Sequence, residues 1–430
     1  MIRFRVWANV RPMGWFGHAA SEYFFEYDDQ WLEQPGAYVL APQFALDKQR
    51  YLGALVRSFF ENLLPEGTAL DDVIAALQRR VPSLREPSAF ELLGQLGNEL
   101  PGVLSLLPEG VQPVPLHTTP SQIYQALPYA ALSERIRSKQ SLLLSNENST
   151  MSLAGAQEKM GLRFHAASKK SPACFSESVG ASPTTHILKP DTRQPRYQPS
   201  AINEYACMKL ARALKLPVPD VWFLRVPEPV YVVQRYDRAN LAGNIVGLHQ
   251  FDGCQLLGHG SGWKYERQGG LVSLPKIVEA LRLLRVRASD LLQLQRWVMF
   301  NYLIGNADAH AKNLSVLVDE NGFQLAPFYD LLCVRVYGDT GLALYIGDED
   351  TFDAVASHSW DAFCKDCGFR KPETMKELAK LARSLLPAWQ KVRANITDKI
   401  AVTSQEQDLL DRMTRVFETH CSYAAAVMAE

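Results

Sequence analysis

The sequence predicts an α+β fold in which a strand-rich lobe is followed by a helical lobe, with a smaller α/β subdomain in front of both. The 430-residue chain is too long for one ordinary hydrophobic core, so two or three structural units are expected. Strand-like segments dominate residues 145–236, and helical periodicity dominates residues 237–430. A proline-rich stretch, "PEGVQPVPLHTTPSQ", separates the first 107 residues from both lobes.

The N-terminal subdomain, residues 1–107, is predicted to mix strands and helices. "RFRVWANV" and "YFFEYDD" have the character of short strands, and "QRYLGALVRSFFENLLP" has that of a helix. "LLGQLGNELPGVLSLLP" is expected to close the subdomain with a strand. Residues 108–144, which begin with the proline-rich stretch, are predicted to be a connector.

The strand-rich lobe, residues 145–236, is predicted to hold one helix, "INEYACMKLARALKL", whose apolar residues recur at helical spacing. Its expected strands are "MGLRFHA", "THILKP", "VWFLRV" and "VYVVQRYD". The last unit, residues 237–430, is expected to be mainly helical, for example in "LPKIVEALRLLRV" and "PETMKELAKLARSLLPAWQKVRANI". Because sites commonly lie between such units, we expect a functional site where the two lobes meet.

The composition excludes several classes of protein. Apolar residues make up 47% and charged residues 21% of the chain, as in globular rather than disordered proteins. No apolar run reaches the length of a membrane span, and the first residues have strand rather than signal-peptide character, so we expect a cytoplasmic protein without a membrane partner. With a net charge of −1, the chain as a whole is not expected to attract nucleic acid electrostatically. Binding to nucleic acid would need a local basic face or a partner protein that supplies the contacts.

The cysteine and histidine patterns do not predict a metal site. Seven scattered cysteines, an odd number, suit a reducing compartment. Cys364 and Cys367 form a CxxC in "FCKDCGF", but no second pair accompanies them, so half-buried thiols are favoured over a redox or metal role. The nine histidines are spread out, and none lies in an HExxH pattern.

The segment "GNADAHAKNLSV", residues 305–316, concentrates polar side chains between a helical run and a strand-like one. A solvated turn would use similar residues. Asp308 and Asn313, however, are five residues apart, which is the spacing of the catalytic Asp and the magnesium-binding Asn in protein kinases. Asp330 follows an apolar strand in "LAPFYDLL", 17 residues after Asn313, much as the second magnesium ligand of a kinase does.

Further parts of a phosphoryl-transfer site occur in the expected order. In "STMSLAGAQEKMGLRF", the small residues Ala154, Gly155 and Ala156 would let the backbone close on phosphate oxygens, although this is not a Walker A loop. Lys189 ends the strand "THILKP" and needs a counter-charge, for which Glu204 in the next helix is suited. "QRYD" lies where a kinase hinge presents its backbone to adenine.

Each of these parts has an ordinary structural explanation, as a glycine turn, a surface lysine or a turn aspartate. Their joint order along one chain is hard to obtain by chance, so the sequence predicts ATP- and Mg²⁺-dependent phosphoryl transfer. One alternative is a pseudokinase that binds nucleotide and acts as a co-repressor. Another is a metal phosphohydrolase that uses "DAH" and Asp330, but this leaves the glycine loop and Lys189 unexplained.

The chain resembles the HipA family of bacterial toxin serine/threonine kinases. The strings that carry the resemblance are "SFFENLLPEG", "FELLGQLGNELPGVLSLLP", "SLAGAQEK", "HILKP", "NEYACMKLARALKLPVPD", "VVQRYDR", "IGNADAHAKN" and "LAPFYDL", which together span nearly the whole sequence. The resemblance implies a bilobal protein-kinase-like fold, with a strand-rich N-lobe, a helical C-lobe and an N-terminal α/β subdomain.

The family's site residues carry over position by position. The resemblance implies that Asp308 is catalytic and that Asn313 and Asp330 bind magnesium. It implies nucleotide contacts at Ala154, Gly155, Ala156, Gln157, Glu158, Lys159, Lys189, Glu204, Gln234, Arg235, Tyr236, Gln250, His310, Asn313, Tyr329 and Asp330. Two positions depart from the family: Gln234 replaces a common Glu, and Phe251, next to Gln250, replaces an acidic residue.

The resemblance also implies a biological role. The chain would be the toxin of a toxin–antitoxin pair and would phosphorylate a translation factor such as an aminoacyl-tRNA synthetase. Its partner would be a small, HipB-like helix-turn-helix antitoxin, which would supply most of the contact with operator DNA.

The serine that matches Ser152 is autophosphorylated in the family, and we expect Ser152 at the mouth of the phosphate loop. A phosphate there, with a charge of roughly −1.5 to −2, would compete with ATP. Ser149 and Thr150 are close enough to be alternative acceptors.

Overall fold

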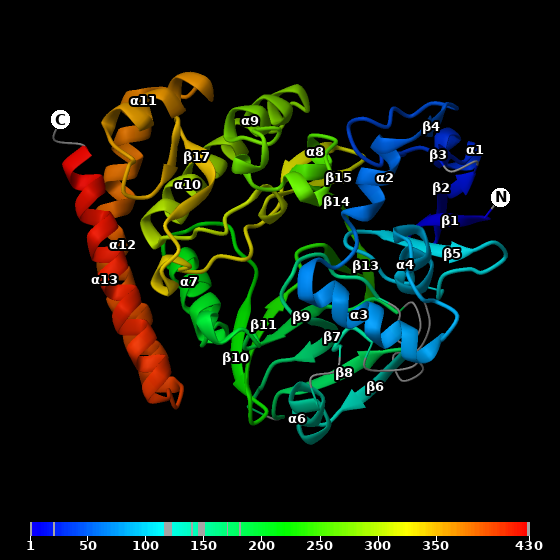
Figure 1. Ribbon diagram of the computed structural model, residues 1–430, viewed down its shortest axis with the longest axis horizontal. Coiled ribbons are helices and arrows are strands. Elements are labelled where there is room, and N and C mark those ends of the chain that lie inside the picture. The colour runs from blue at the N-terminus through cyan, green and yellow to red at the C-terminus, as the bar shows by residue number, and fades with distance from the viewer. Residues whose placement is uncertain are drawn as a thin grey trace.

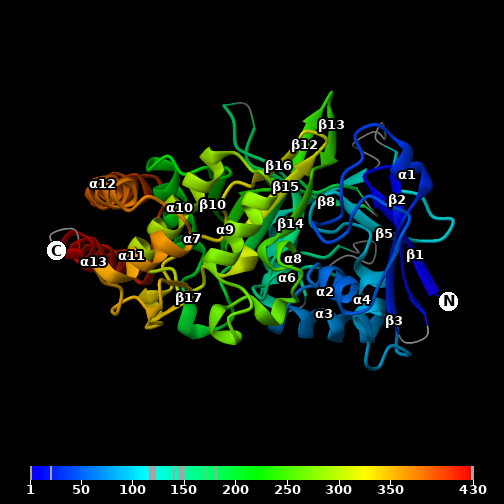
Figure 2. The ribbon, with the colours of Figure 1, turned by 90° about the horizontal axis from the view of Figure 1, so that it is seen from above.

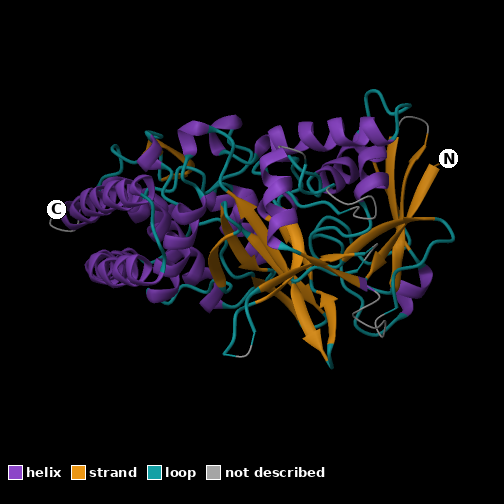
Figure 3. Ribbon diagram, turned by 90° about the horizontal axis from the view of Figure 1, so that it is seen from below, coloured by secondary structure: helices purple, strands orange, loops and turns teal. Residues whose placement is uncertain are grey.

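The computed structural model describes residues 2–19, 22–115, 123–138, 141–144, 151–169, 171–179 and 182–427. The chain runs from a sheet at one end of the molecule, through a second sheet, to a pair of long helices at the other end (Figure 1). In Figure 3 the strands gather in the N-terminal and central parts, and the helices gather towards the C-terminus.

The N-terminal subdomain is a five-stranded antiparallel sheet in the order β4-β3-β2-β1-β5. The strands are β1 (Ile2–Ala8), β2 (Arg11–Ala19), β3 (Glu22–Tyr27), β4 (Arg50–Leu52) and β5 (Leu104–Pro108). The helices are α1 (Asp29–Glu33), α2 (Ala54–Glu61), α3 (Gly67–Arg80) and α4 (Ala89–Leu96). The helices α2 and α4 pack on the sheet, and the ring of Phe16 on β2 stacks on that of Phe60 on α2 with centroids 3.9 Å apart.

The strand-rich lobe is a six-stranded antiparallel sheet in the order β10-β11-β9-β7-β8-β6. Its strands are β6 (Tyr124–Leu127), β7 (Met160–His165), β8 (Cys174–Ser178), β9 (His186–Pro190), β10 (Val221–Arg225) and β11 (Pro229–Gln234). Its main helix, α7 (Ala201–Ala213), contacts β10 and β11. Because strand residues alternate between faces, Leu188 and Val232 join a separate small core, while Tyr231 and Val233 join the main core.

Residues 108–144 differ from the predicted connector. Within this range the chain forms β6 and the helix α6 (Tyr129–Ser138), and β6 pairs with β8 as the edge of the second sheet. The four-residue strand "YQAL" is too short to show a periodic pattern, so sequence reasoning could not find it.

The helical lobe contains α8 (Gly253–Leu256), α9 (Leu274–Leu283), α10 (Ala288–Ile304), α11 (Ser357–Asp366), α12 (Lys371–Lys399) and α13 (Ser404–Val427). It also contains more strands than the sequence suggested: β12 (Arg238–Leu241), β13 (Asn244–Gly247), β14 (His249–Asp252), β15 (Ser315–Asp319), β16 (Gly322–Leu325), β17 (Gly341–Ile346) and β18 (Glu349–Thr351). The hairpin of β12 and β13 projects from the molecule in Figure 2. The helices α12 and α13 pack against each other and on α10.

The predicted α+β, two-lobe arrangement with an N-terminal subdomain is confirmed. The helix α10 is capped by Gly305, whose φ of +68° turns the chain into the polar segment 305–316. Among the described residues, no helix is long and apolar enough to cross a membrane.

Candidate active site

A cavity of about 250 Å³ lies where the two lobes and the N-terminal subdomain meet. Most of the predicted site residues line it. These are Ala154, Gly155, Ala156, Gln157, Lys159, Lys189, Glu204, Gln234, Arg235, Tyr236, Gln250, Asp308, His310, Asn313, Tyr329 and Asp330. Residues that are up to 176 positions apart in the sequence therefore converge on one cleft.

A buried lysine lies between two carboxylates on one side of this cleft. The Nζ atom of Lys189, on β9, lies 2.9 and 3.0 Å from the two carboxylate oxygens of Glu204 on α7. It also lies 2.6 Å from Oδ1 of Asp330. The predicted Lys189–Glu204 pair is thus present. Asp330 has a φ of +58°, an uncommon backbone conformation for a residue other than glycine, and such conformations are often found at functional sites.

The charges of this triad depend on one another. Burial alone would lower the pKa of Lys189, but Asp330 and Glu204 outweigh it and hold that pKa above its ordinary value. Burial raises the pKa of Glu204 to about 7, against the opposing effect of Lys189. For Asp330, burial is outweighed by Lys189 and Lys159, which lower its pKa to about 2. One carboxylate therefore remains charged at neutral pH, while the other is close to its titration point.

The loop from Ala154 to Lys159 follows a backbone bridge between Met151 and Glu99 of the N-terminal subdomain. Gly155 has a φ of +105°, and a Cβ atom there would lie 2.5 Å from the Nζ atom of Lys159. The Lys159 Nζ atom donates a hydrogen bond of 2.6 Å to the carbonyl of Ala154. Burial, and then the charge of Lys189, lower the pKa of Lys159 to about 8. The loop thus carries a second cation into the cleft beside Lys189.

Glu158 of this loop and Ser152, just before it, do not lie where the sequence predicted them. The Glu158 side chain does not line the cleft, and its carboxylate accepts a hydrogen bond of 2.5 Å from Arg193. Ser152 does not lie at the mouth of the loop. It is fully buried, and its hydroxyl donates to the carbonyl of Leu63 in the N-terminal subdomain. Ser149 and Thr150 lie outside the described residues.

The segment after α10 presents Asp308 and Asn313 to the cleft. The amide side chain of Asn313 donates a hydrogen bond of 2.7 Å to the backbone carbonyl of Asp308. The backbone N–H of Asp308 donates 3.2 Å to the side-chain oxygen of Asn306. With its amide nitrogen used in this way, Asn313 keeps its side-chain oxygen for a ligand. The five-residue spacing therefore also fixes the local backbone geometry of this segment.

His310, two residues after Asp308, is buried beside the cleft. Burial lowers its pKa, so the ring is neutral at physiological pH. Its Nδ1 atom is buried and makes no hydrogen bond with the described residues. The ring lies edge-on to that of Tyr265, with centroids 5.1 Å apart. The hydroxyl of Tyr265 in turn donates a hydrogen bond to Oδ1 of Asp308.

The opposite end of the cleft is aromatic. The rings of Tyr236, in the predicted hinge, and Tyr329 are stacked with centroids 5.2 Å apart. The Tyr236 hydroxyl donates a hydrogen bond of 3.0 Å to the side-chain oxygen of Gln250, which is buried. The side chain of Gln234 is exposed, as expected if only backbone groups of the hinge meet a base. Phe251 is fully buried in the core, so this departure from the family pattern does not alter the cleft lining.

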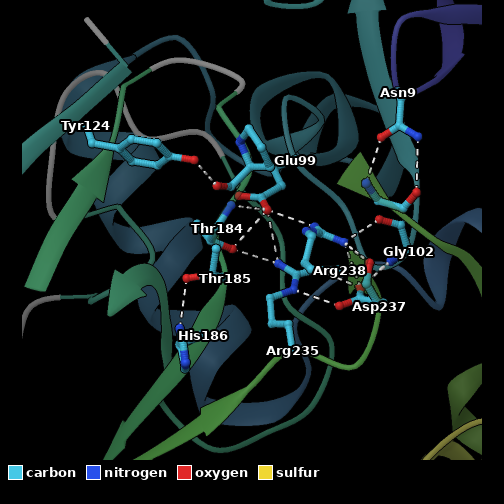
Figure 4. Close-up of polar contacts among 12 residues, drawn as sticks. Asn9, Glu99, Gly102, Tyr124, Thr184, Thr185, His186, Arg235, Asp237 and Arg238 are labelled. Carbon is cyan, nitrogen blue, oxygen red and sulfur yellow. Dashed lines mark hydrogen bonds and ion pairs between the residues drawn. The ribbon is translucent and has the colours of Figure 1, made fainter. Parts of the chain in front are cut away.

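The predicted hinge is held in place by a buried network of charged side chains. The guanidinium groups of Arg235 and Arg238 point towards the carboxylates of Glu99 and Asp237 in Figure 4. Burial alone would raise the pKa of Asp237, but the two arginines outweigh it and hold that pKa far below its ordinary value. The carboxylate of Asp237 also accepts a hydrogen bond of 2.7 Å from the backbone N–H of Gly102. Arg235 thus lines the cleft, and its side chain ties the predicted hinge to Glu99 of the N-terminal subdomain.

Sequence reasoning missed a buried lysine of the polar segment 305–316. Lys312 is buried, and its Nζ atom lies 2.8 Å from Asp252 and 2.9 Å from two oxygens of Asn62. Glu66 lies 3.4 Å away. Burial would lower the pKa of Lys312, but Asp252 and Glu66 raise it above its ordinary value. A lysine among alanines in "AHAKN" was a signal that a counter-charge was needed, but its partners are up to 250 residues distant.

The residues present are suited to a nucleotide with its magnesium ion. Lys159 and Lys189 supply the cations that phosphates require, and Asn313 and Asp330 supply an amide oxygen and a carboxylate. No group of three or more His, Cys, Asp or Glu residues suited to a metal ion occurs in the described part of the chain. Magnesium commonly binds one or two protein oxygens together with substrate phosphates, so this donor set suits Mg²⁺ brought in with a nucleotide.

Comparison with known proteins gives two matching family models. The HipA N-terminal domain matches residues 4–107, and the HipA-like C-terminal domain matches residues 151–389. The protein Y4mE of Sinorhizobium fredii is 32% identical over 401 residues, which cover 91% of this chain and 92% of that protein. The serine/threonine-protein kinase toxin HipA of Shewanella oneidensis is 26% identical over 387 residues, which cover 86% of this chain and 84% of that protein.

A solved structure has the same fold. In the complex of HipA and HipB with operator DNA from Shewanella oneidensis MR-1, one chain matches with a TM-score of 0.83 at 23% identity and covers 99% of both chains. This likeness supports the predicted kinase-like fold with its additional N-terminal subdomain.

Proposed function

The chain belongs to the HipA family, and on this basis we propose that it is a serine/threonine protein kinase that transfers the γ-phosphate of ATP to a protein hydroxyl. The observation that carries the proposal is the convergence of three groups in one cleft. These are the Lys189–Glu204 pair, the carboxylate of Asp330 and the Asp308–Asn313 segment.

The residues have distinct roles in this reaction. Asp308 orients the acceptor hydroxyl and accepts its proton, while the hydroxyl oxygen forms a bond to the γ-phosphorus and the bond from that phosphorus to ADP breaks. Lys189 binds the phosphates in place of its present contact with Asp330, and Glu204 keeps the ammonium group aimed at the cleft. Asn313 and Asp330 would hold magnesium. The chemistry that bound Mg²⁺ supplies is neutralisation of charge on the phosphates.

The two alternatives explain less of the site. A pseudokinase co-repressor would not need Asp308, which lies in the cleft with its carboxylate held by Tyr265. A metal phosphohydrolase built on Asp308, His310 and Asp330 would not need the two lysines of the cleft.

The kinase proposal is tested by phosphoproteomics after a short pulse of expression. We expect wild type to create new phosphoserine or phosphothreonine on a translation factor such as an aminoacyl-tRNA synthetase, and Asp308→Asn to create none. The same phosphosites in both strains, or none in wild type, would contradict the proposal. The identity of the phosphorylated protein would name the substrate.

We further propose that the chain is a toxin that joins operator DNA through a small helix-turn-helix antitoxin, because a structural neighbour is a HipA–HipB–operator complex. The net charge of −1 leads us to expect weak DNA binding by the chain alone. Gel-shift titration at two salt concentrations measures this, since affinity driven by phosphate contacts falls steeply with ionic strength. Tight, sequence-specific binding by the isolated chain would count against the proposal.

Autophosphorylation at Ser152 would inactivate the enzyme by displacing the phosphate loop. The Ser152 hydroxyl is fully buried and donates to the carbonyl of Leu63, so that burying a group with roughly −1.5 to −2 charges there would be costly. We expect intact-mass and peptide mapping after incubation with ATP to find one phosphate on Ser152, absent in Asp308→Asn, and the modified protein to lose ATP binding. A phosphate only on Ser149 or Thr150, or unchanged ATP binding, would refute this mechanism.

A further inference from the structure

We propose that Tyr265 is a positioning residue that holds the carboxylate of Asp308 in its working orientation. The inference rests on the kinase activity proposed above and extends it to a loop between α8 and α9 that carries none of the sequence motifs. The Tyr265 hydroxyl donates a hydrogen bond to Oδ1 of Asp308. Within the described part of the chain, it is the one side chain that donates to this carboxylate.

The hydrogen bonds of the catalytic segment fix the main chain of Asp308 but not its side chain. The backbone N–H of Asp308 is held by Asn306 at 3.2 Å, and its carbonyl is held by Asn313 at 2.7 Å. Neither bond restricts rotation about the two side-chain torsions. The hydrogen bond from Tyr265 does so, because it holds Oδ1, and it leaves Oδ2 for an acceptor hydroxyl.

Tyr265 is itself held in place by several contacts. Its ring meets the edge of His310, and the guanidinium carbon of Arg267 lies 4.3 Å from the ring centroid. Its backbone N–H donates 3.1 Å to the side-chain oxygen of Gln268. The carbonyl of the preceding residue, Lys264, accepts a hydrogen bond of 3.1 Å from the catalytic segment at Ala311.

The same loop is tied to the N-terminal subdomain. The Nζ atom of Lys264 lies 2.7 Å from Oε2 of Glu66, which precedes α3. The backbone N–H of Glu66 donates 3.2 Å to the carbonyl of Gly155 in the phosphate loop. A continuous set of contacts therefore joins the phosphate loop, Glu66, Lys264 and Tyr265 to the catalytic carboxylate.

The phenol of Tyr265 stays protonated and can therefore donate its hydrogen bond at all physiological pH values. Burial, and then the negative charge of Asp308, raise the pKa of the Tyr265 phenol well above its ordinary value. The phenol therefore keeps its proton across the physiological pH range, and the hydrogen bond to the carboxylate persists.

The test compares Tyr265→Phe with Tyr345→Phe in the full-length protein, using γ-labelled ATP and a protein substrate. Tyr345 is the matched control because it contacts the same loop through its backbone, while its hydroxyl makes no hydrogen bond with the described residues. We expect Tyr265→Phe to lower kcat about ten- to a hundredfold, as loss of a hydrogen bond to a charged group does. The KM for ATP should change by less than about twofold, because the nucleotide contacts remain.

A double mutant separates positioning from a general structural effect. If Tyr265 acts through Asp308, adding Tyr265→Phe to Asp308→Asn should lower the residual rate no further. An unchanged kcat in Tyr265→Phe, a raised one, or phosphate found on Tyr265 itself would overturn the inference while leaving the kinase proposal intact. Absence of transfer by wild type would instead defeat the proposed function.

Discussion

Asp308→Asn is expected to reduce phosphoryl transfer by about two to four orders of magnitude while ATP still binds. The substitution keeps the shape of the side chain but removes its negative charge, so the acceptor hydroxyl is no longer oriented or deprotonated. The phosphate-binding groups are unaffected, because Lys189 and Lys159 contact other residues. Single-turnover transfer with labelled ATP measures the rate, and calorimetric titration measures the affinity.

The control for this variant is Asp366→Asn, which makes the same chemical change at an exposed position on α11. It should have wild-type activity. If Asp308→Asn retained near-full activity, the assignment of the catalytic carboxylate would be wrong. If it lost ATP binding as well, Asp308 would have to be assigned to the nucleotide rather than to the acceptor.

Lys189→Ala is expected to have the second largest effect, lowering kcat/KM for ATP by one or more orders of magnitude through loss of a charge-assisted phosphate contact. It should also destabilise the fold in a pH-dependent way, because Glu204 stays buried without its cation. The pKa of Glu204 is already raised to about 7, and removal of Lys189 raises it further. A carboxyl with a raised folded-state pKa favours the folded state at low pH, so the loss of stability should be larger at pH 8 than at pH 6.

Two further variants make this prediction specific. Glu204→Gln should affect activity less than Lys189→Ala, since it removes an orienting partner and not the phosphate contact. Lys209→Ala, at a half-buried lysine of α7 that lies over the ring of Tyr205, should change neither ATP kinetics nor the pH dependence of unfolding. Equal kcat/KM for ATP in wild type and Lys189→Ala would contradict the assignment of Lys189 as the lysine that binds the ATP phosphates.

The parts of the fold and site that the sequence revealed are those with local signals. The Asp308-x4-Asn313 spacing, the apolar strand ending in Lys189 and the helix carrying Glu204 are each visible within a few residues, and the chain brings them to one cleft. The strand β9 and the helix α7 formed where periodicity predicted them. A pattern of this kind needs no knowledge of distant segments.

The parts that the sequence did not reveal depend on contacts between distant segments. The partners of Lys312 come from the N-terminal subdomain and from the start of α8. No local sequence pattern around Lys312 predicts these contacts. Tyr265 lies in a loop whose residues also suit an ordinary turn, and its role follows only from its distance to Asp308. Burial of Ser152 likewise depends on Leu63, 89 positions away.

The phosphate loop also determines how the molecule unfolds. Backbone bridges join Gly155 to Pro65 and Met151 to Glu99, so the wall of the cleft is shared between segments that two separate family models describe. Removing the first 107 residues would expose this wall to water and leave the carbonyl of Gly155 without its donor. We therefore expect the subdomain and the strand-rich lobe to unfold as one cooperative unit, so that amide hydrogens on both sides of the junction exchange with solvent in the same opening event.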